Sequence, residues 1–172
     1  MNDMHDRVAT RIPEFFLRPA TESDTSLILS FIRELAEYER LSHEVVASED
    51  GIREALYGPR PAAEVIIGEY QDQPAAFALF FHNFSTFLGK PGLYLEDLFV
   101  KPDLRGMGLG KAILAYLARL ALERGCGRFE WWVLDWNKPA LKFYRSIGAE
   151  PMDEWTVQRV SGDALVELAD SF

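Results

Sequence analysis

The sequence predicts an α/β domain on one mixed sheet, antiparallel in its first half and partly parallel around a long helix. Three observations carry this prediction. Apolar residues between 27 and 38 recur every three or four positions, which is typical of an amphipathic helix. Residues 63–81 have the pattern of two strands joined by a turn. Residues 93–134 then have the pattern of a strand, a long helix and a strand, an order that produces a parallel pair.

Local start and stop signals set the element boundaries. An acid follows the Thr21 hydroxyl by three residues, which is typical of a helix start. Gly148 is placed to end a late helix. The predicted elements are a strand at 15–18, a helix from 21–24 through Tyr38, a short helix between Ser48 and Gly58, strands at 63–70, 75–81 and 93–100, a helix at 109–124, a strand at 128–134, a helix at 139–147, a strand at 154–160 and a helix at 162–169. We expect residues 1–14 to be a flexible extension and residues 15–172 to form a single domain, because no Gly/Ser-rich linker divides them.

Composition excludes several classes of protein. The 172 residues carry a net charge of −9, which disfavours a nucleic-acid partner and weakly favours a cationic ligand. No apolar run approaches the roughly 20 residues that span a bilayer, and we expect neither a membrane span nor a secretory signal. Cys126 is the only cysteine, and the three histidines match no metal-ligand spacing. We therefore expect no disulfide, no metal and a cytoplasmic location.

A glycine-rich loop is the most informative stretch of the chain. Residues 105–110 read Arg-Gly-Met-Gly-Leu-Gly and join the buried strand at 93–100 to a long helix. Glycines allow a ligand to approach the backbone, and the free N–H groups of a helix start attract phosphate oxygens. Arg105 adds a cation. The glycine spacing is GxGxG, which differs from the GxGxxG of the dinucleotide fingerprint. A P-loop is excluded because Lys111 is followed by alanine, where a P-loop has serine or threonine. The alternative is a helix start with three incidental glycines.

This loop resembles the acetyl-CoA pyrophosphate loop of the GNAT N-acetyltransferase superfamily. The segments Tyr94–Val100 and Val133–Ala140, followed by Phe143-Tyr144, resemble its diamine (spermidine/spermine) N-acetyltransferase-like branch. The segments Leu17–Thr21 and Glu34–Glu39 also fit that branch. The likeness extends over roughly residues 15 to 170. It implies the GNAT fold, in which a central mixed sheet with flanking helices is splayed at the acetyl-CoA site.

The resemblance implies acetyl-CoA as cofactor, with CoA as product. The splay is expected between the strands at 93–100 and 129–134, where the pantetheine arm would pair with backbone groups near Leu98 and Val100. The expected cofactor-binding residues are Leu98, Phe99, Val100, Arg105, Gly106, Met107, Gly108, Leu109, Gly110, Lys111, Asn137 and Tyr144.

The proton chemistry of amine acylation suggests roles for two adjacent acids. An alkylamine has a pKa near 10 and arrives protonated, whereas only the neutral amine attacks a thioester. Glu96, at the end of the central strand, can accept that proton directly or through a water. Asp97 is expected on the opposite face of the strand, since side chains alternate. The resemblance implies that Glu96 deprotonates the amine and Asp97 holds the cationic substrate. The alternative is a solvated strand end.

The departing thiolate needs a proton donor. Asn137 and Tyr144 are seven residues apart on a predicted helix and therefore share a face. In the family, the matching tyrosine is the general acid and the asparagine contacts the cofactor arm. The alternative for Tyr144 is a core aromatic residue. We expect Tyr144 and Glu96 to be the catalytic residues, with a backbone N–H near Leu98 stabilising the oxyanion. No nucleophile is evident, so direct attack in a ternary complex is expected.

The acceptor site is expected at residues that match family positions or supply an aromatic wall. The expected substrate-binding residues are Glu96, Asp97, Tyr38, Glu39, Phe87 and Trp155. A helix-end charge or a core aromatic residue is the alternative for each of the last four.

The resulting prediction is an N-acetyltransferase that acts on a primary amine of a small basic molecule, such as a polyamine, a diamine or a lysine-like amino acid. Two alternatives stay open: a protein lysine or N-terminal acetyltransferase, and a non-catalytic acyl-CoA-binding regulatory domain. A homodimer is expected from the resemblance alone.

Overall fold

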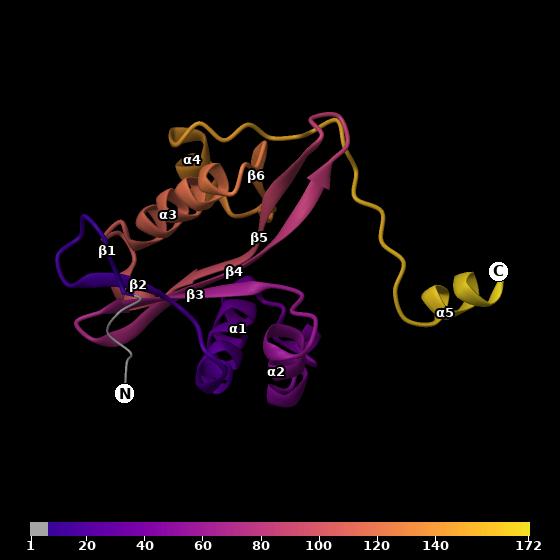
Figure 1. The fold of residues 1–172 in the computed structure, drawn as a ribbon, viewed down its shortest axis with the longest axis horizontal. Coiled ribbons are helices and arrows are strands. Elements are labelled where there is room, and N and C mark those ends of the chain that lie inside the picture. The colour runs from indigo at the N-terminus through magenta and orange to yellow at the C-terminus, as the bar shows by residue number, and fades with distance from the viewer. Residues whose placement is uncertain (1–6) are drawn as a thin grey trace. The chain divides into compact units, whose positions relative to one another are not determined.

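The computed structural model of the protein describes residues 7–172 (Figure 1). The chain divides into two compact units, Met1–Trp132 and Val133–Phe172. The first unit holds the sheet and the two longest helices, so the predicted phosphate loop and the paired acids all lie within it.

One six-stranded sheet forms the framework of the first unit. Its strands are β1 (Val8–Ala9), β2 (Phe15–Pro19), β3 (Glu64–Tyr70), β4 (Gln73–Ser85), β5 (Lys90–Val100) and β6 (Arg128–Trp131). They lie in the sheet in the same order as in the chain. Every neighbouring pair is antiparallel except β5 and β6, which are parallel. The predicted mixed sheet is therefore present. Its parallel strands, β5 and β6, come before and after the long helix at residues 109–123 in the chain.

The helices cover both faces of this sheet. The α-helices are α1 (Thr25–Glu39), α2 (Glu49–Tyr57), α3 (Leu109–Glu123), α4 (Lys138–Ser146) and α5 (Asp163–Asp170), and short 3-10 turns lie at Glu22–Asp24, Ser42–Glu44 and Pro102–Leu104. Figure 1 shows α1 and α2 on one face of the sheet and α3 on the other. The helices α4 and α5 belong to the second unit.

Side-chain hydrogen bonds mark the start of the 3-10 turn Glu22–Asp24, which leads into α1, and the start of α2. The Asp24 carboxylate accepts a hydrogen bond of 2.8 Å from the Thr21 N–H, closing the predicted capping box. The Arg18 guanidinium of β2 donates two hydrogen bonds of 2.8 Å to the same carboxylate. Burial alone would raise the pKa of Asp24, but these hydrogen bonds outweigh it and lower the pKa. Ser48 caps α2 by accepting from the Gly51 N–H at 3.1 Å.

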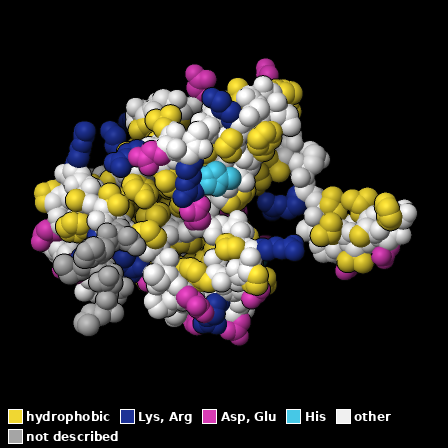
Figure 2. All heavy atoms as spheres, in the orientation of Figure 1, with side chains coloured by type: hydrophobic (Ala, Val, Ile, Leu, Met, Phe, Trp, Pro, Cys, Tyr) yellow, Lys and Arg dark blue, Asp and Glu magenta, His cyan; other side chains and the backbone are white. Residues whose placement is uncertain are grey.

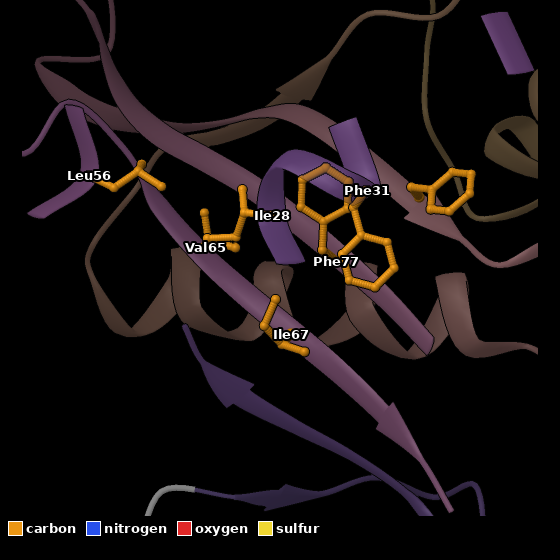
Figure 3. Close-up of a cluster of buried hydrophobic side chains, with 7 residues drawn as sticks. Ile28, Phe31, Leu56, Val65, Ile67 and Phe77 are labelled. Carbon is orange, nitrogen blue, oxygen red and sulfur yellow. The ribbon is translucent and has the colours of Figure 1, made fainter. Parts of the chain in front are cut away.

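Aromatic and aliphatic side chains fasten α1 and α2 to the sheet (Figure 3). The cluster consists of Ile28, Phe31, Leu56, Val65, Ile67, Phe77 and Phe99. The Phe31 ring of α1 stacks on the Phe77 ring of β4, with centroids 5.3 Å apart, and lies 6.0 Å from the Phe99 ring of β5. Because Phe77 and Phe99 are directly opposite in the β4–β5 register, this contact fixes which face of both strands α1 covers.

The structure differs from the predicted elements in several places. The β4–β5 hairpin is longer than predicted, since β4 runs to Ser85 and β5 begins at Lys90. β1 pairs with β2 inside the range expected to be an extension, so the sheet begins at residue 8; residues 1–6 lie outside the described part. β6 ends at Trp131, three residues earlier than predicted. The strand predicted at 154–160 is wrong: that segment is irregular and exposed. A strand needs a neighbouring ladder to satisfy its backbone groups, and between residues 7 and 172 none pairs with this segment.

The surface mixes charges of both signs. On the face drawn in Figure 2, basic and acidic side chains are interspersed among apolar ones. Within residues 7–172, no helix is both long enough and apolar enough to cross a bilayer.

Candidate functional site

The glycine loop leaves the start of α3 open to a ligand. Gly106 and Gly108 have φ values of 83° and 87°, a region that strains residues with a Cβ. Gly108 is the N-cap of α3, no side chain caps this end, and its first turn contains no acidic residue. The partial positive charge of the helix start is therefore not neutralised by the protein's own side chains in this turn. The backbone N–H groups of this turn could therefore bind a phosphate group, and the phosphate-binding role of the loop stays a prediction.

The sheet opens beside this loop. The parallel pairing of β5 with β6 runs only from Gly92 opposite Arg128 to Leu95 opposite Trp131. β5 continues to Val100 with β4 on one side. In the described residues, no strand lies on its other side beyond Leu95. The backbone of residues 96–100 is therefore available on this side to pair with an extended ligand, as predicted for the arm of the cofactor.

A β-bulge in β5 coincides with the start of this opening. In the β4–β5 register Leu79 is opposite Asp97 and Phe80 is opposite Leu95, so Glu96 is an extra residue without a partner. Tyr94 lies opposite Phe81, on the face that α1 covers.

The prediction that Glu96 and Asp97 point to opposite faces is wrong. Glu96 shares the face of Tyr94, two residues earlier. Asp97 lies opposite Leu79, which is on that same face of β4. The inserted residue shifts the alternation by one position, so both acids lie on the α1 face.

Negative charge is concentrated around Asp97. Burial, followed by the charges of Glu96 and Glu39, raises the pKa of Asp97 to about 6. Burial also raises the pKa of Glu39, at the C-terminal end of α1. The structure thus brings together three of the predicted acceptor-site residues. A cationic ligand entering this group would relieve the repulsion between carboxylates.

Arg105 is engaged with its neighbours in the first unit. Its Nε donates to the Val100 carbonyl at 2.9 Å. Its Cζ lies 4.4 Å from the centroid of the Tyr38 ring and 5.4 Å from that of the Phe99 ring. Arg105 therefore connects the start of the glycine loop with the end of β5 and the last turn of α1, and the Val100 carbonyl already has one partner.

The predicted acid and its companion lie together on α4 in the second unit. Asn137 is the N-cap of this helix, and its Oδ1 accepts a hydrogen bond of 3.3 Å from the Ala140 N–H. Its amide oxygen therefore has a local structural role in addition to the predicted cofactor contact. The Tyr144 ring lies 5.5 Å from the Phe143 ring. Trp155, 71% exposed, lies in the irregular segment of the same unit.

Phe87 is not brought to the acids. It is 94% exposed at the tip of the β4–β5 hairpin, beyond the Ser85–Lys90 pair. At about 3.3 Å per strand residue, the six residues from Lys90 to Glu96 separate the tip from the acids by roughly 20 Å. Nothing in the first unit therefore makes Phe87 a neighbour of Glu96.

Sequence reasoning missed an aromatic wall beside the acids. The Tyr94 ring lies 5.0 Å from Phe81 and 6.0 Å from Trp132. Burial, then the charges of Glu96 and Glu130, raise the pKa of Tyr94 to about 12. The side-chain alternation along β5, with Tyr94 two positions before Glu96, was the signal that could have identified it.

Comparisons with known proteins identify the family of the chain. A family model described as the acetyltransferase (GNAT) family matches residues 29–149. A thialysine N-epsilon-acetyltransferase from Sus scrofa is 39% identical over 164 residues, covering 89% of this chain and 96% of that protein. An L-ornithine N5-acetyltransferase from Arabidopsis thaliana is 33% identical over 194 residues, covering 87% and 85%. Among solved structures, an integron cassette protein of V. cholerae gives a TM-score of 0.77 at 26% identity, covering 91% of this chain and 98% of that one.

A mixed sheet that opens beside a glycine loop, with acids where the strands part, defines an acyl-group transferase. The chain belongs to the acetyltransferase (GNAT) family. The predicted superfamily, the mixed α/β fold and the N-acetyltransferase class are confirmed.

Proposed function

We propose that this chain transfers the acetyl group of acetyl-CoA to the primary amine of a small basic molecule. One observation carries the proposal: the bulge at Glu96 places two consecutive carboxylates on one face of β5, where β5 separates from β6. A thioester delivered by the glycine loop would meet an amine held by these acids. The names of the thialysine and ornithine relatives support a small amine as acceptor.

The chain's own residues fit the cofactor. The backbone of residues 105–111, together with the uncapped start of α3, would hold the diphosphate of acetyl-CoA. The open side of residues 98–100 would pair with the amides of its arm. When bound, acetyl-CoA supplies the thioester that is attacked. The family resemblance gives Asn137 the contact with that arm and Tyr144 the donation of a proton to the departing thiolate, and both residues belong to α4 and its N-cap.

Two functions are divided among the acids. Glu96 is exposed and accepts the proton of the arriving ammonium group, directly or through water. Asp97 and Glu39 hold the cation. Burial raises the pKa of both carboxyl groups, the charges of Glu96 and Glu39 raise that of Asp97 further, and a nearby ammonium group would favour the ionised form of each. Tyr38, beside Glu39 on α1, would line the acceptor site, and Trp155 is proposed as a further substrate-binding residue. The amine then attacks the thioester directly, without a covalent enzyme intermediate.

The oligomeric state and location belong to the same proposal. The family resemblance supports a homodimer, which sizing chromatography with light scattering tests directly; a monomer at assay concentration rejects it. The net charge of −9 and the single cysteine support a cytoplasmic location. Partners are then a small cationic amine and a second copy of the chain, with no role for nucleic acid or membrane.

An acceptor screen tests the function. Purified protein is incubated with acetyl-CoA and, separately, polyamines, diamines, lysine, ornithine, thialysine and lysine-containing peptides, and released CoA is followed with a thiol-reactive dye. Cys126 is a free, half-buried thiol, so each rate is referred to a reaction without amine and to Cys126→Ser as controls for dye uptake by the protein. We expect turnover with small dibasic amines. Turnover with peptides alone favours the protein-acetylating alternative, and acetyl-CoA binding without turnover favours the regulatory one.

A further inference from the structure

Arg105 makes contacts within the protein that a residue serving only to bind phosphate would not need. A guanidinium carries five N–H donors on its edge and two flat faces. Here the Arg105 Nε donates a hydrogen bond to the Val100 carbonyl, and the Arg105 Cζ lies 4.4 Å from the centroid of the Tyr38 ring. The first residue of the glycine loop is therefore tied to the helix that supplies one wall of the acceptor site.

Tyr38 and Glu39 are the last two residues of α1. The helix stops immediately afterwards, because Arg40 adopts a left-handed conformation with φ of 64°. The stacked Phe31 ring anchors α1 about two turns earlier. Tyr38 is 40% exposed, and its ring contacts the Arg105 guanidinium at the start of the glycine loop. Glu39 is in this turn, and its charge acts on Asp97.

We propose that Arg105 is a positioning residue that couples the cofactor site to the acceptor site. Its flat face stacks on Tyr38 while N–H groups on its edge stay available to phosphate oxygens. Binding of the diphosphate would immobilise Arg105, and this would hold the turn that carries Glu39 against Asp97. The inference rests on the proposed function and assigns a coupling role to one residue of it: through Arg105, a bound CoA diphosphate raises the affinity for the amine.

Reciprocity makes the coupling measurable. If CoA raises the affinity for the amine by some factor, the amine raises the affinity for CoA by the same factor. We expect a factor of about 5 to 10 in the wild type, within the usual range for coupled sites. It is measured by titrating the best amine from the screen into the protein alone and into the protein saturated with CoA, which cannot react.

Three variants separate coupling from charge and from folding. Arg105→Lys keeps the charge but has no flat face to stack. Tyr38→Leu removes the ring and leaves the glycine loop intact, whereas Tyr38→Phe keeps the ring. We expect the coupling factor to fall to about 1 in Arg105→Lys and Tyr38→Leu and to persist in Tyr38→Phe. If Arg105 and Tyr38 act through each other, the double variant Arg105→Lys/Tyr38→Leu should have the same KM for the amine as Arg105→Lys alone. Thermal melts of all variants check that folding is retained.

Several outcomes overturn the inference. A wild-type amine affinity that is unchanged by CoA removes the coupling. An Arg105→Lys variant with a raised KM for acetyl-CoA but an unchanged coupling factor leaves Arg105 as a phosphate ligand only. Additive effects of the two substitutions show that the residues act independently. Failure of the proposed function looks different: the wild type would then acetylate no amine in the screen.

Discussion

Glu96 and Asp97 are consecutive residues of one strand, and yet both lie on the face of the sheet that α1 covers. The cause is the bulge between Leu95 and Asp97, which inserts Glu96 without a partner on β4. A regular strand would place one of the two acids on the α3 side. The bulge thus allows one carboxylate to be exposed and the other to be half-buried next to it, and gives two adjacent acids different environments at one site.

Asp97 should impose a pH dependence on amine binding. Its pKa of about 6 means that below pH 6 the carboxyl is neutral and no longer attracts a cation. We expect kcat/KM for the amine to rise with pH through about 6, and Asp97→Asn to lose this limb and raise the amine KM about tenfold, the loss of one charged hydrogen bond. Initial-rate profiles between pH 5 and 8 measure the rise in kcat/KM and the amine KM. If kcat/KM of Asp97→Asn still rises through pH 6, the rise is due to another group.

The same carboxyl should make the fold less stable at high pH. Its folded pKa of about 6 lies above the ordinary value of 3.8, so it favours the folded state below pH 3.8, and this contribution is lost as the pH rises through 6. Asp97→Asn should therefore be more stable than the wild type at pH 8, by up to about 2–3 kcal/mol, and equal to it near pH 4. Urea unfolding at both pH values measures this. Asp153→Asn, at an exposed site, is the matched control and should leave the free energy of unfolding unchanged at both pH values.

Glu96 should matter less as the amine loses its own proton. At pH 7 we expect Glu96→Gln to lower kcat about 100-fold, a usual contribution of a general base. Near pH 10 the free amine is already neutral, so the deficit should shrink. Rates of both proteins across this range give the ratio directly. A deficit that stays constant with pH would mean that Glu96 positions the substrate without accepting its proton.

Tyr144 should act on the leaving group. Tyr144→Phe keeps the ring beside Phe143 and removes only the hydroxyl, so the variant should lose most of its turnover and still bind acetyl-CoA. Calorimetric titration and steady-state rates separate the two. Tyr116→Phe, on α3 and outside the proposed site, is the matched control. Unchanged turnover in Tyr144→Phe would remove this tyrosine from the mechanism.

The two glycines at the start of α3 should respond differently to alanine. Gly108 has a φ of 87°, which costs an alanine about 1 kcal/mol or more, so Gly108→Ala should lower both the melting temperature and the affinity for acetyl-CoA. A Cβ on Gly110 would meet the Val100 side chain at 3.7 Å, an ordinary contact. Gly110→Ala should therefore melt at the same temperature or higher. A loss of acetyl-CoA affinity in that variant then reports how closely the ligand approaches the backbone.

Much of the fold follows from local patterns in the sequence. The capping box at Thr21–Asp24, the cap at Ser48 and the periodicity of α1 were visible in the sequence, because these signals depend on neighbours within about four residues. The strand predicted at 154–160 shows the limit of such patterns. Apolar alternation there satisfied the local rule, but a strand also requires a partner at a distance in the chain, which the pattern does not supply.

The candidate site was predictable in residue type and less so in geometry. The acids and the loop were identified from their positions around one strand. The shared face of Glu96 and Asp97 was not, since a bulge is set by the register with β4 and has no signature in periodicity. The stacking of Arg105 on Tyr38 joins residues 67 positions apart, and only tertiary packing reveals it.

The inserted residue at position 96 also has a consequence for how this gene can change. Exchanging a side chain on β5 alters one contact, but deleting a single codon between Leu95 and Asp97 would restore regular pairing with β4. The shortened chain could still form the sheet, and its remaining acid would keep the same neighbour, Leu79, while the exposed carboxylate disappeared. Lineages that lost this codon would retain a stable fold and lose their proton acceptor in one step, so length in this segment should vary less than composition.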